Sequence, residues 1–300
     1  MPITISSIPD IHLSQVELWV RPEEYRAYKS QDYASKLKEI HVWPEHIDCA
    51  FKKRKWFCEN VGQSDDFMML DDDVRLSAWS VKQNRYLPAK TNPKLFDRYF
   101  SDVFPNLFSK YQHVAAANKF MANPYINEKG LLKERAVGPV VWGFAKGATS
   151  HVKHNRVFGY ADMYIPYQVF KKYNGNTVVH YGICFGHDNR PELRTTGIHY
   201  RSPLIMVDTI MKLAHYMPGV VTGYRMTGKD EDRWLMIKHM SRVLKGVTPA
   251  NLQASKTFID EECVKRGLSR APDKYVYDDE TPRDEIIARI RANWKAVKLP

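Results

Sequence analysis

The chain has few cysteines, and those it has are far apart. Cys49, Cys58, Cys184 and Cys263 form no Cys-x-x-Cys pair. Thiolate zinc sites and disulfide frameworks both need regularly spaced cysteines, so the sequence argues against either. Long apolar runs are also missing, and residues 1–10 lack the basic-then-apolar order of a signal peptide. We therefore expect a soluble cytoplasmic protein with no membrane partner.

Four common catalytic motifs are absent as well. There is no Gly-x-x-x-x-Gly-Lys-Ser/Thr phosphate loop, no Gly-x-Gly-x-x-Gly, no Gly-x-Ser-x-Gly and no His-Glu-x-x-His. Kinase-like, dehydrogenase-like, serine-hydrolase and zincin functions lose their usual support. What is present is a chain of 300 residues, 44% hydrophobic and 12% aromatic, enough for one large α/β domain or two small ones.

Basic residues exceed acidic ones. The chain has 45 lysines and arginines against 34 aspartates and glutamates, a net charge of +11. A fold does not need this excess, which favours a polyanionic partner, with nucleic acid as the first candidate. A general preference for solubility explains many basic proteins, and charge alone does not separate the two explanations.

The most informative segment is Phe67–Val74, in which four apolar residues run into three aspartates. The apolar run predicts a buried strand, and ligands bind beyond the carboxyl ends of strands. Alternation along a strand sends Asp71 and Asp73 to one side and Asp72 to the other, which offers two carboxylates to one divalent cation. A solvated acidic turn is the alternative, but the preceding strand favours the metal.

Strand-like and helix-like segments alternate before the aspartates. Residues 16–20 and 40–43 indicate strands. A polar helix from Pro22 to about Leu37 lies between them, and a second helix covers 47–60. This order predicts a parallel three-layer domain. The second helix carries the basic run Lys52-Lys53-Arg54-Lys55, which borders the nucleotide pocket in a fold of this order, although a solvated helix face is the alternative.

After the aspartates, residues 86–109 are rich in proline, asparagine and aromatics and indicate an excursion with short helices. Strands are predicted at 138–144 and 177–185. Helices are predicted at 204–216, at 231–244 and from about 281 onward.

One series of segments resembles the donor half of GT-A glycosyltransferases. It consists of a helix with Arg-Lys, a short loop, an apolar strand and Leu-Asp-Asp-Asp. Later segments sharpen the resemblance toward the TET/JBP-associated glycosyltransferases, a family linked to sugar transfer onto hydroxymethylated pyrimidines in DNA, often in phages. These segments are Gln112–Asn123, Ala161–Phe170, Thr195–Arg201 and Met217–Val221. The resemblance covers about residues 14–225. It departs from the family where an acidic pair is reduced to Asp162 and paired glycines to Gly197.

The resemblance implies a GT-A-type, Rossmann-like three-layer α/β sandwich over residues 1–245, with a donor half at about 14–80 and an acceptor half at about 81–245. A helical extension would cover 246–300. It also implies a metal-dependent transferase that moves glucose or arabinose from a nucleotide-sugar, a UDP-sugar first, to a base such as hydroxymethylcytosine in DNA. The cofactor would be Mn²⁺ or Mg²⁺, and a phage-encoded enzyme would act in the host cytoplasm.

The resemblance also implies roles for individual residues. Asp71 and Asp73 would hold the metal, with His199 as a candidate third ligand. The donor would be bound by Lys53, Arg54, Asp71, Asp72 and Arg201.

On the acceptor side, Asp162 would be the general base that takes the proton from the attacking hydroxyl, with Asp188 as its rival. A purely structural N-cap is the other interpretation of Asp162. A loop that mixes positive charge with hydrogen-bond donors favours nucleic-acid contact; its residues are His151, Lys153, His154 and Arg156.

Two other functions stay open. One is a GT-A enzyme that acts on a glycan or a protein, with the basic charge incidental. The other is a metal-dependent nuclease or a non-catalytic DNA-binding protein that uses the same acidic and basic segments. A nuclease would need a lysine paired closely with the carboxylates, whereas Asp73-Val74-Arg75 offers an arginine.

Overall fold

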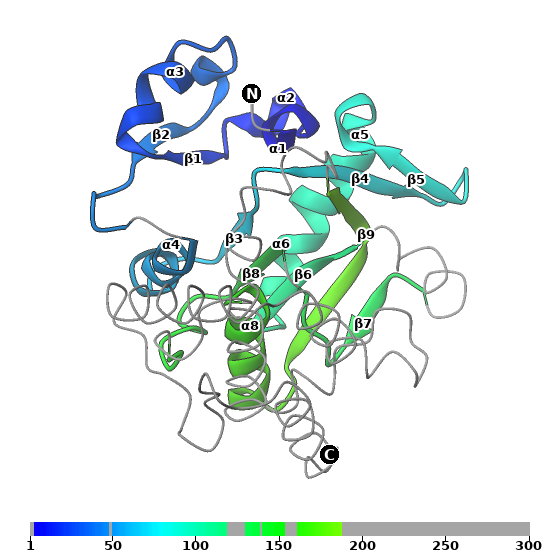
Figure 1. Cartoon of the computed structure of the whole chain (residues 1–300). Coiled ribbons are helices and arrows are strands. Elements are labelled where there is room, and N and C mark those ends of the chain that lie inside the picture. Colours follow the sequence, from blue (N-terminus) through cyan, green and yellow to red (C-terminus); the bar gives the residue numbers. More distant parts are fainter. Residues whose placement is uncertain (1–2, 48–49, 119–129, 139, 154–160, 188–300) are drawn as a thin grey trace, which may run out of the picture. The chain divides into compact units, whose positions relative to one another are not determined.

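The computed structural model describes residues 3–47, 50–118, 130–138, 140–153 and 161–187 (Figure 1). The chain divides into two compact units, Met1–His151 with Val169–Asp188 and Val152–Gln168 with Asn189–Pro300. The helices predicted at 204–216 and 231–244, the boundary at residue 245 and the extension over 246–300 lie outside the described residues.

A small parallel sheet forms near the amino terminus. Strands β1 (Glu17–Val20) and β2 (Glu39–Val42) pair in parallel, which confirms the two strands predicted there. The predicted helix between them is broken into η1 (Pro22–Glu24), α3 (Tyr25–Lys29) and η2 (Ala34–Lys36). The side chains of Ser30 and Gln31 both donate to the carbonyl of Ala27 and so compete with a continuing helix.

The main sheet has seven strands of mixed direction. Across the sheet they are β3 (Phe67–Leu70), β8 (Val141–Phe144), β6 (His113–Asn118), β9 (Thr177–His187), β4 (Val74–Ser80) and β5 (Arg85–Pro88), while β7 (Leu132–Glu134) pairs with β9. The β6–β9 pair is parallel and the other pairs are antiparallel. The chain is therefore a mixed α/β protein.

The strand predicted before the aspartates is β3, but the strands predicted to lie beside it were wrong. The order of segments suggested one parallel sheet that includes β1, β2 and β3. Instead β3 pairs antiparallel with β8, and β1 and β2 form a sheet of their own. Strands β4 and β5 were not predicted, because β4 begins directly after the aspartates and β5 lies inside the proline-rich excursion.

The longest strand, β9, changes partners along its length. Its first residues pair with β6 and β7, and its last residues pair with β4. The register with β6 shifts between Ala116 and Ala117. Gly182 lies at this shift, where an added Cβ would stand 2.3 Å from the ring of His180 and 2.4 Å from the ring of Tyr99. The close packing of these two rings therefore requires glycine.

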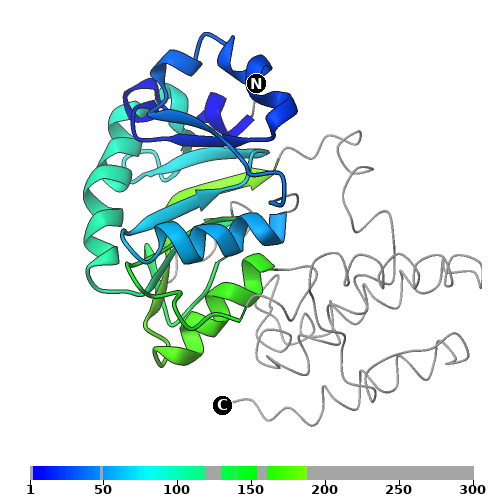
Figure 2. The ribbon, with the colours of Figure 1, turned by 90° about the vertical axis from the view of Figure 1, so that its left-hand side faces the viewer.

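Helices cover both faces of the main sheet (Figure 2). On one face, α4 (Ala50–Trp56) continues into the π-helical turn η3 (Phe57–Val61), and Phe57 stacks on Phe67 of β3. On the other face lie α5 (Pro93–Asp97), the π-helical η5 (Arg98–Val103) and α6 (Phe104–Phe108), which follow η4 (Ala89–Thr91). Alternate residues of a strand face opposite sides, so Phe67 and Met68 pack against different layers.

Two helices at the amino terminus, α1 (Ile3–Ser7) and α2 (Asp10–Leu13), precede the small sheet, and α8 (Ala161–Lys172) precedes β9. The predicted helix from about residue 47 begins at Ala50 and ends, with its π-helical turn, at Val61. The predicted strands at 138–144 and 177–185 are β8 and β9.

The core of the main sheet contains a neutral histidine. His113 is buried, its Nδ1 lies 2.9 Å from the carbonyl of Gly143, and its Nε2 accepts a hydrogen bond from the amide of Gly138 at 3.3 Å. Nε2 is therefore the acceptor, and Nδ1 carries the proton and donates it to Gly143. Burial lowers the pKa of His113 to about 3. Burial also lowers the pKa of His180 to about 4.

We expect the protein to lose stability in mild acid because of these histidines. Below the ordinary histidine pKa of 6.5, His113 binds a proton in the unfolded chain but stays neutral in the folded chain. Protonation therefore favours unfolding as the pH falls from 6.5 toward about 3. Each buried histidine should contribute a slope of up to about 1.4 kcal/mol per pH unit. Urea unfolding measured between pH 7 and pH 5, where carboxylates stay ionised, checks this.

The His113→Asn variant is the control for this prediction. It should be less stable at every pH, but the dependence of its unfolding free energy on pH should be shallower than that of the wild type. An unfolding free energy that stays constant between pH 6.5 and pH 5 would contradict the prediction.

Candidate functional site

The three aspartates form a turn, which we call the acidic turn (Asp71–Asp73). It joins the end of β3 at Leu70 to the start of β4 at Val74. Asp71 and Asp73 are half-buried and Asp72 is exposed. The predicted strand thus ends before the aspartates, and the turn, rather than strand alternation, places their side chains.

The acidic turn lies where three strands end together. Strands β3 and β6 are both antiparallel to β8, and β9 is parallel to β6, so β3, β6 and β9 all run in one direction. Their carboxyl ends meet at one edge of the sheet, the edge where open α/β sheets bind ligands. His187, the last residue of β9, pairs with Val74 directly after the turn.

Thr4 of α1 ties both ends of the acidic turn together. Its hydroxyl donates to the carbonyl of Asp71 at 2.5 Å and accepts a hydrogen bond from the amide of Val74 at 3.0 Å. Its own amide donates to the carbonyl of Asp72 at 3.2 Å. One buried threonine therefore holds the backbone at the start of the acidic turn, in its middle and directly after it. Sequence reasoning missed Thr4, because a threonine far away in the chain carries no local signal of this role.

Val140 supports the acidic turn from the other side. Its carbonyl accepts a hydrogen bond from the amide of Asp71 at 3.3 Å. Its φ angle is +74°, in the left-handed region that a β-branched residue rarely adopts. Such strain costs of order 1–3 kcal/mol and persists where surrounding contacts enforce it, often at functional sites.

Arg54 pairs with the carboxylate of Asp71. Its Nη2 lies 3.3 Å from Oδ1 of Asp71, and the two side chains are 19% and 35% exposed. This contact brings together two residues that were predicted to bind the donor. It joins α4 to the acidic turn and leaves a guanidinium where a phosphate oxygen could also be bound.

The other basic residues of the run have separate partners. Lys52 donates to the carbonyl of His46, Lys53 lies 5.4 Å from the centre of the Trp43 ring, and Lys55 is 3.8 Å from Glu59. The sequence treated Lys53 and Arg54 alike; in the structure the guanidinium of Arg54 pairs with Asp71, and the ammonium of Lys53 lies over the ring of Trp43.

An aromatic cluster explains the position of α4. The ring of Trp19 in β1 stacks on His41 in β2 at 4.2 Å between centroids and lies 4.6 Å from Trp56 in α4. Trp43 and Phe57 complete the cluster. Large aromatic rings bury much apolar surface and dominate the energy of the contacts they make. The small sheet therefore holds α4, and with it Arg54, beside the acidic turn.

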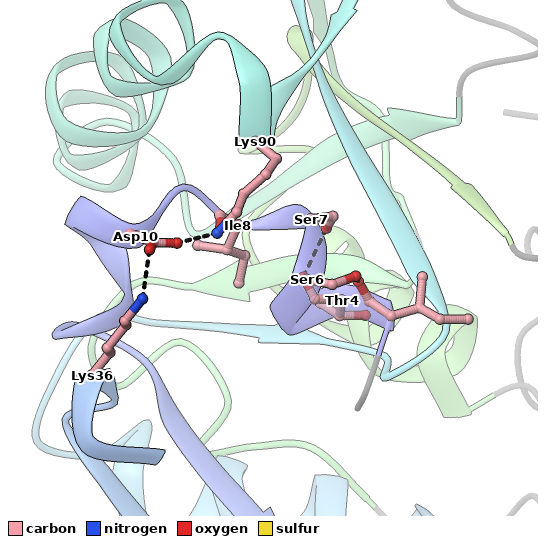
Figure 3. A network of polar contacts seen from close by, with 8 residues as sticks. Thr4, Ser6, Ser7, Ile8, Asp10, Lys36 and Lys90 are labelled. Carbon is pink, nitrogen blue, oxygen red and sulfur yellow. Dashed lines mark hydrogen bonds and ion pairs between the residues drawn. The ribbon is translucent and has the colours of Figure 1, made fainter. Parts of the chain in front are cut away.

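An exposed ion-pair network joins the amino-terminal helices to later segments (Figure 3). Asp10 of α2 contacts Lys36 at 2.7 Å and also contacts Lys90. Hydrogen bonds from Lys36 and Lys90 lower the pKa of Asp10 to about 2. Lys90 also donates to the carbonyl of Ile8 at 3.3 Å. The network ties the segment that follows Thr4 to η2 and η4.

The chemistry of the acidic turn suits a hard divalent cation. Carboxylate oxygens are the ligands that Mg²⁺ and Mn²⁺ prefer, and Mg²⁺ is usually bound by one or two carboxylates together with substrate phosphates. Within the described part of the chain, no group of three or more His, Cys, Asp or Glu side chains is arranged to hold a metal ion. Asp71 and Asp73 could supply the one or two carboxylates of a site of this kind.

The remaining predicted residues are partly described. Asp162 is half-buried in the first turn of α8, in the second unit, which confirms that a helix begins there. The ring of His151 contacts the ring of Tyr173. The backbone amide of Lys153 donates to Gln168 at 2.9 Å. Outside the described residues lie His154, Arg156, Asp188, His199 and Arg201.

Thr4→Val should destabilise the protein by about 1–3 kcal/mol. Valine keeps the shape of threonine but leaves the amide of Val74, a fully buried residue, without its hydrogen-bond partner. Thr4→Ser retains the hydroxyl and should cost about 1 kcal/mol or less. Urea unfolding of both variants, with amide exchange at Val74 as a local readout, measures the difference. Equal stability of the two variants would show that the hydroxyl does not hold the acidic turn.

Comparisons with protein-family models, with curated proteins and with solved structures gave no match for this chain. In the part of the chain that the structure describes, no helix is both long and apolar enough to span a bilayer.

Proposed function

We propose that the protein is a metal-dependent glycosyltransferase of the GT-A type that moves a sugar from a nucleotide-sugar to a hydroxymethylated pyrimidine in DNA. The observation that carries the proposal is the acidic turn: two half-buried aspartates beside an arginine, at the common carboxyl edge of β3, β6 and β9. The resemblance to the TET/JBP-associated glycosyltransferases supplies the acceptor, and the net charge of +11 supports a polyanionic partner.

The residues of the acidic turn would bind the donor. Asp71 and Asp73 would hold Mn²⁺ or Mg²⁺, which neutralises the diphosphate and so improves it as a leaving group. Arg54, already fixed by Asp71, would bind a phosphate oxygen. The hydrogen bonds of Thr4 and Val140 would keep the backbone of the turn in place, so that binding costs little reorganisation.

Asp162 would act on the acceptor. An ionised carboxylate can take the proton of the attacking hydroxyl while the anomeric carbon loses the nucleotide. Its place in the first turn of α8 also suits a carboxylate, because the positive end of the helix dipole favours negative charge there.

A donor panel tests the proposal. The protein is incubated with Mn²⁺, with hydroxymethylated DNA and with each of several nucleotide-sugars, and the DNA is then digested to nucleosides and weighed by mass spectrometry. A base heavier by one hexose or pentose supports the transferase. Sugar found on an added glycan or protein instead of DNA would favour the glycan-acting enzyme, and DNA nicking without a donor would favour a nuclease.

A further inference from the structure

Basic side chains gather at the edge of the main sheet opposite the acidic turn. The amino ends of β6 and β9 lie at that edge, beside β7 and the last turn of α8 (Figure 1). Five exposed basic residues come from three segments there: Lys110, Lys133, Arg135, Lys171 and Lys172. We call this set the basic end.

Arg135 connects β7 to the end of α8. Its amide donates to the carbonyl of Thr177 at 2.8 Å. Its guanidinium lies over Gly175, where an added Cβ would stand 3.1 Å from Cζ of Arg135. The amide of Gly175 in turn donates to the carbonyl of Phe170, which closes the helix. Arg135 therefore lies against the same helix end that carries Lys171 and Lys172.

Lys110 belongs to the same surface. Two residues later, the amide of Gln112 donates to the carbonyl of Asn176 at 2.9 Å. The hydroxyl of Tyr111 donates to Glu134 of β7. In the described segments 110–112, 132–135 and 169–177, Glu134 is the sole carboxylate. Within these three segments, five positive charges therefore accompany one negative charge.

Helix stabilisation alone does not explain this arrangement. Cations near a helix carboxyl end interact favourably with the helix dipole, which accounts for Lys171, Lys172 and Arg135. Lys110 and Lys133 come from other segments and add charge to the same surface, where like charges repel each other. Such a concentration of one sign is the electrostatic pattern of a surface that binds a polyanion.

We propose that the basic end binds the phosphate backbone of DNA, away from the site of sugar transfer. The choice of DNA as the polyanion rests on the proposed function. Strand β6 has six residues and spans about 20 Å at 3.3 Å per residue. This is about twice the Debye length at physiological salt, so the acidic turn at the far edge barely weakens the attraction.

Aromatic side chains accompany the charges. Tyr173 follows Lys172 in the sequence, and its ring contacts the ring of His151 at 5.7 Å between centroids. His151 begins the loop that the sequence predicted to bind DNA. Through Tyr173 the structure therefore places His151 beside the basic end, and surfaces that bind nucleic acid commonly combine aromatic rings with cations in this way.

Neutralising three lysines tests the proposal. The variant Lys110→Gln, Lys171→Gln, Lys172→Gln is compared with the wild type for binding to unmodified duplex DNA, without donor, over a range of salt concentrations. Each lost phosphate contact should reduce the slope of log K against log salt by about 0.9, so we expect a reduction of about 2–3. Binding at low salt should weaken by about tenfold or more.

The matched control carries the same charge change elsewhere. Arg26→Gln, Lys29→Gln, Lys94→Gln removes three exposed charges from α3 and α5, away from the basic end (Figure 1). It should bind DNA nearly as the wild type does. Equal weakening in both variants, or no change in the first, would overturn the proposal.

Two further measurements separate the possible causes. Thermal unfolding shows whether the first variant lost only helix stability. In that case its melting temperature falls while the slope of log K against log salt stays unchanged, and the proposal is wrong. Donor hydrolysis with Mn²⁺ is measured independently of DNA. Loss of DNA binding with intact hydrolysis supports the basic end, whereas absent hydrolysis in the wild type contradicts the proposed function alone.

Discussion

Asp73→Ala should abolish sugar transfer and weaken binding of the nucleotide-sugar in the presence of Mn²⁺. Asp73 is half-buried in the acidic turn, close in sequence to the Asp71 that Arg54 holds. A cation bound by one or two carboxylates and a diphosphate loses a large part of its protein ligation when one carboxylate is removed. The fold should persist, because the change relieves repulsion among three adjacent acids. Titration calorimetry with and without Mn²⁺, together with the transfer assay, measures both effects.

Asp65→Ala is the matched control for this experiment. Asp65 is an exposed aspartate shortly before β3, and its side chain accepts a hydrogen bond from Ser64. Its removal changes the net charge equally but should leave transfer and donor binding as in the wild type. Full transfer activity in Asp73→Ala would remove this residue from the metal site.

Asp162→Asn should fold, bind donor and DNA as the wild type does, and turn over about a hundredfold more slowly or worse. Asparagine has nearly the same shape as aspartate, so the first turn of α8, in which Asp162 lies, should be preserved. Asparagine cannot accept a proton, and general-base catalysis typically contributes 10²–10⁴-fold. Single-turnover rates with saturating donor and DNA separate this chemical step from binding.

Asp188→Asn is the comparison that decides between the two candidate bases. If Asp162→Asn turns over normally and Asp188→Asn is inactive, Asp188 is the base and our assignment of Asp162 is wrong. If both variants transfer sugar at the original rate, neither carboxylate accepts the proton, and a mechanism with retention of configuration becomes the better account. Asp162→Ala should lose turnover and also some stability, because it removes the favourable negative charge from the first turn of α8.

The backbone geometry of the acidic turn depends on contacts between segments that are far apart in the sequence. The sequence predicted that Arg54 and Asp71 both bind the donor, and the structure adds their direct contact. The contacts of the Thr4 hydroxyl and the Val140 carbonyl could not be predicted, because each residue comes from a segment far away in the chain. A buried hydroxyl contact of this kind is created by folding and leaves no periodic pattern.

The sequence by itself determined those elements whose signal is local. The apolar run before the aspartates predicted β3, the strand-like run at 177–185 predicted β9, and the acidic residue before an amphipathic segment predicted the start of α8. Each follows from hydrophobic period and helix-end chemistry, which neighbouring residues are sufficient to express.

Only the tertiary structure decided which strands pair. The local pattern of β3 is the same whether its neighbour is β2 or β8, because an apolar strand is buried equally well beside either one. The antiparallel pairing of β3 with β8, with Gly143 placed where an added Cβ would stand 2.2 Å from the carbonyl of Phe67, excludes the parallel sheet that the order of segments suggested. The same pairing brings the ends of β3, β6 and β9 to one edge and so places the acidic turn there. Contacts between distant segments, which no local pattern encodes, determine that edge.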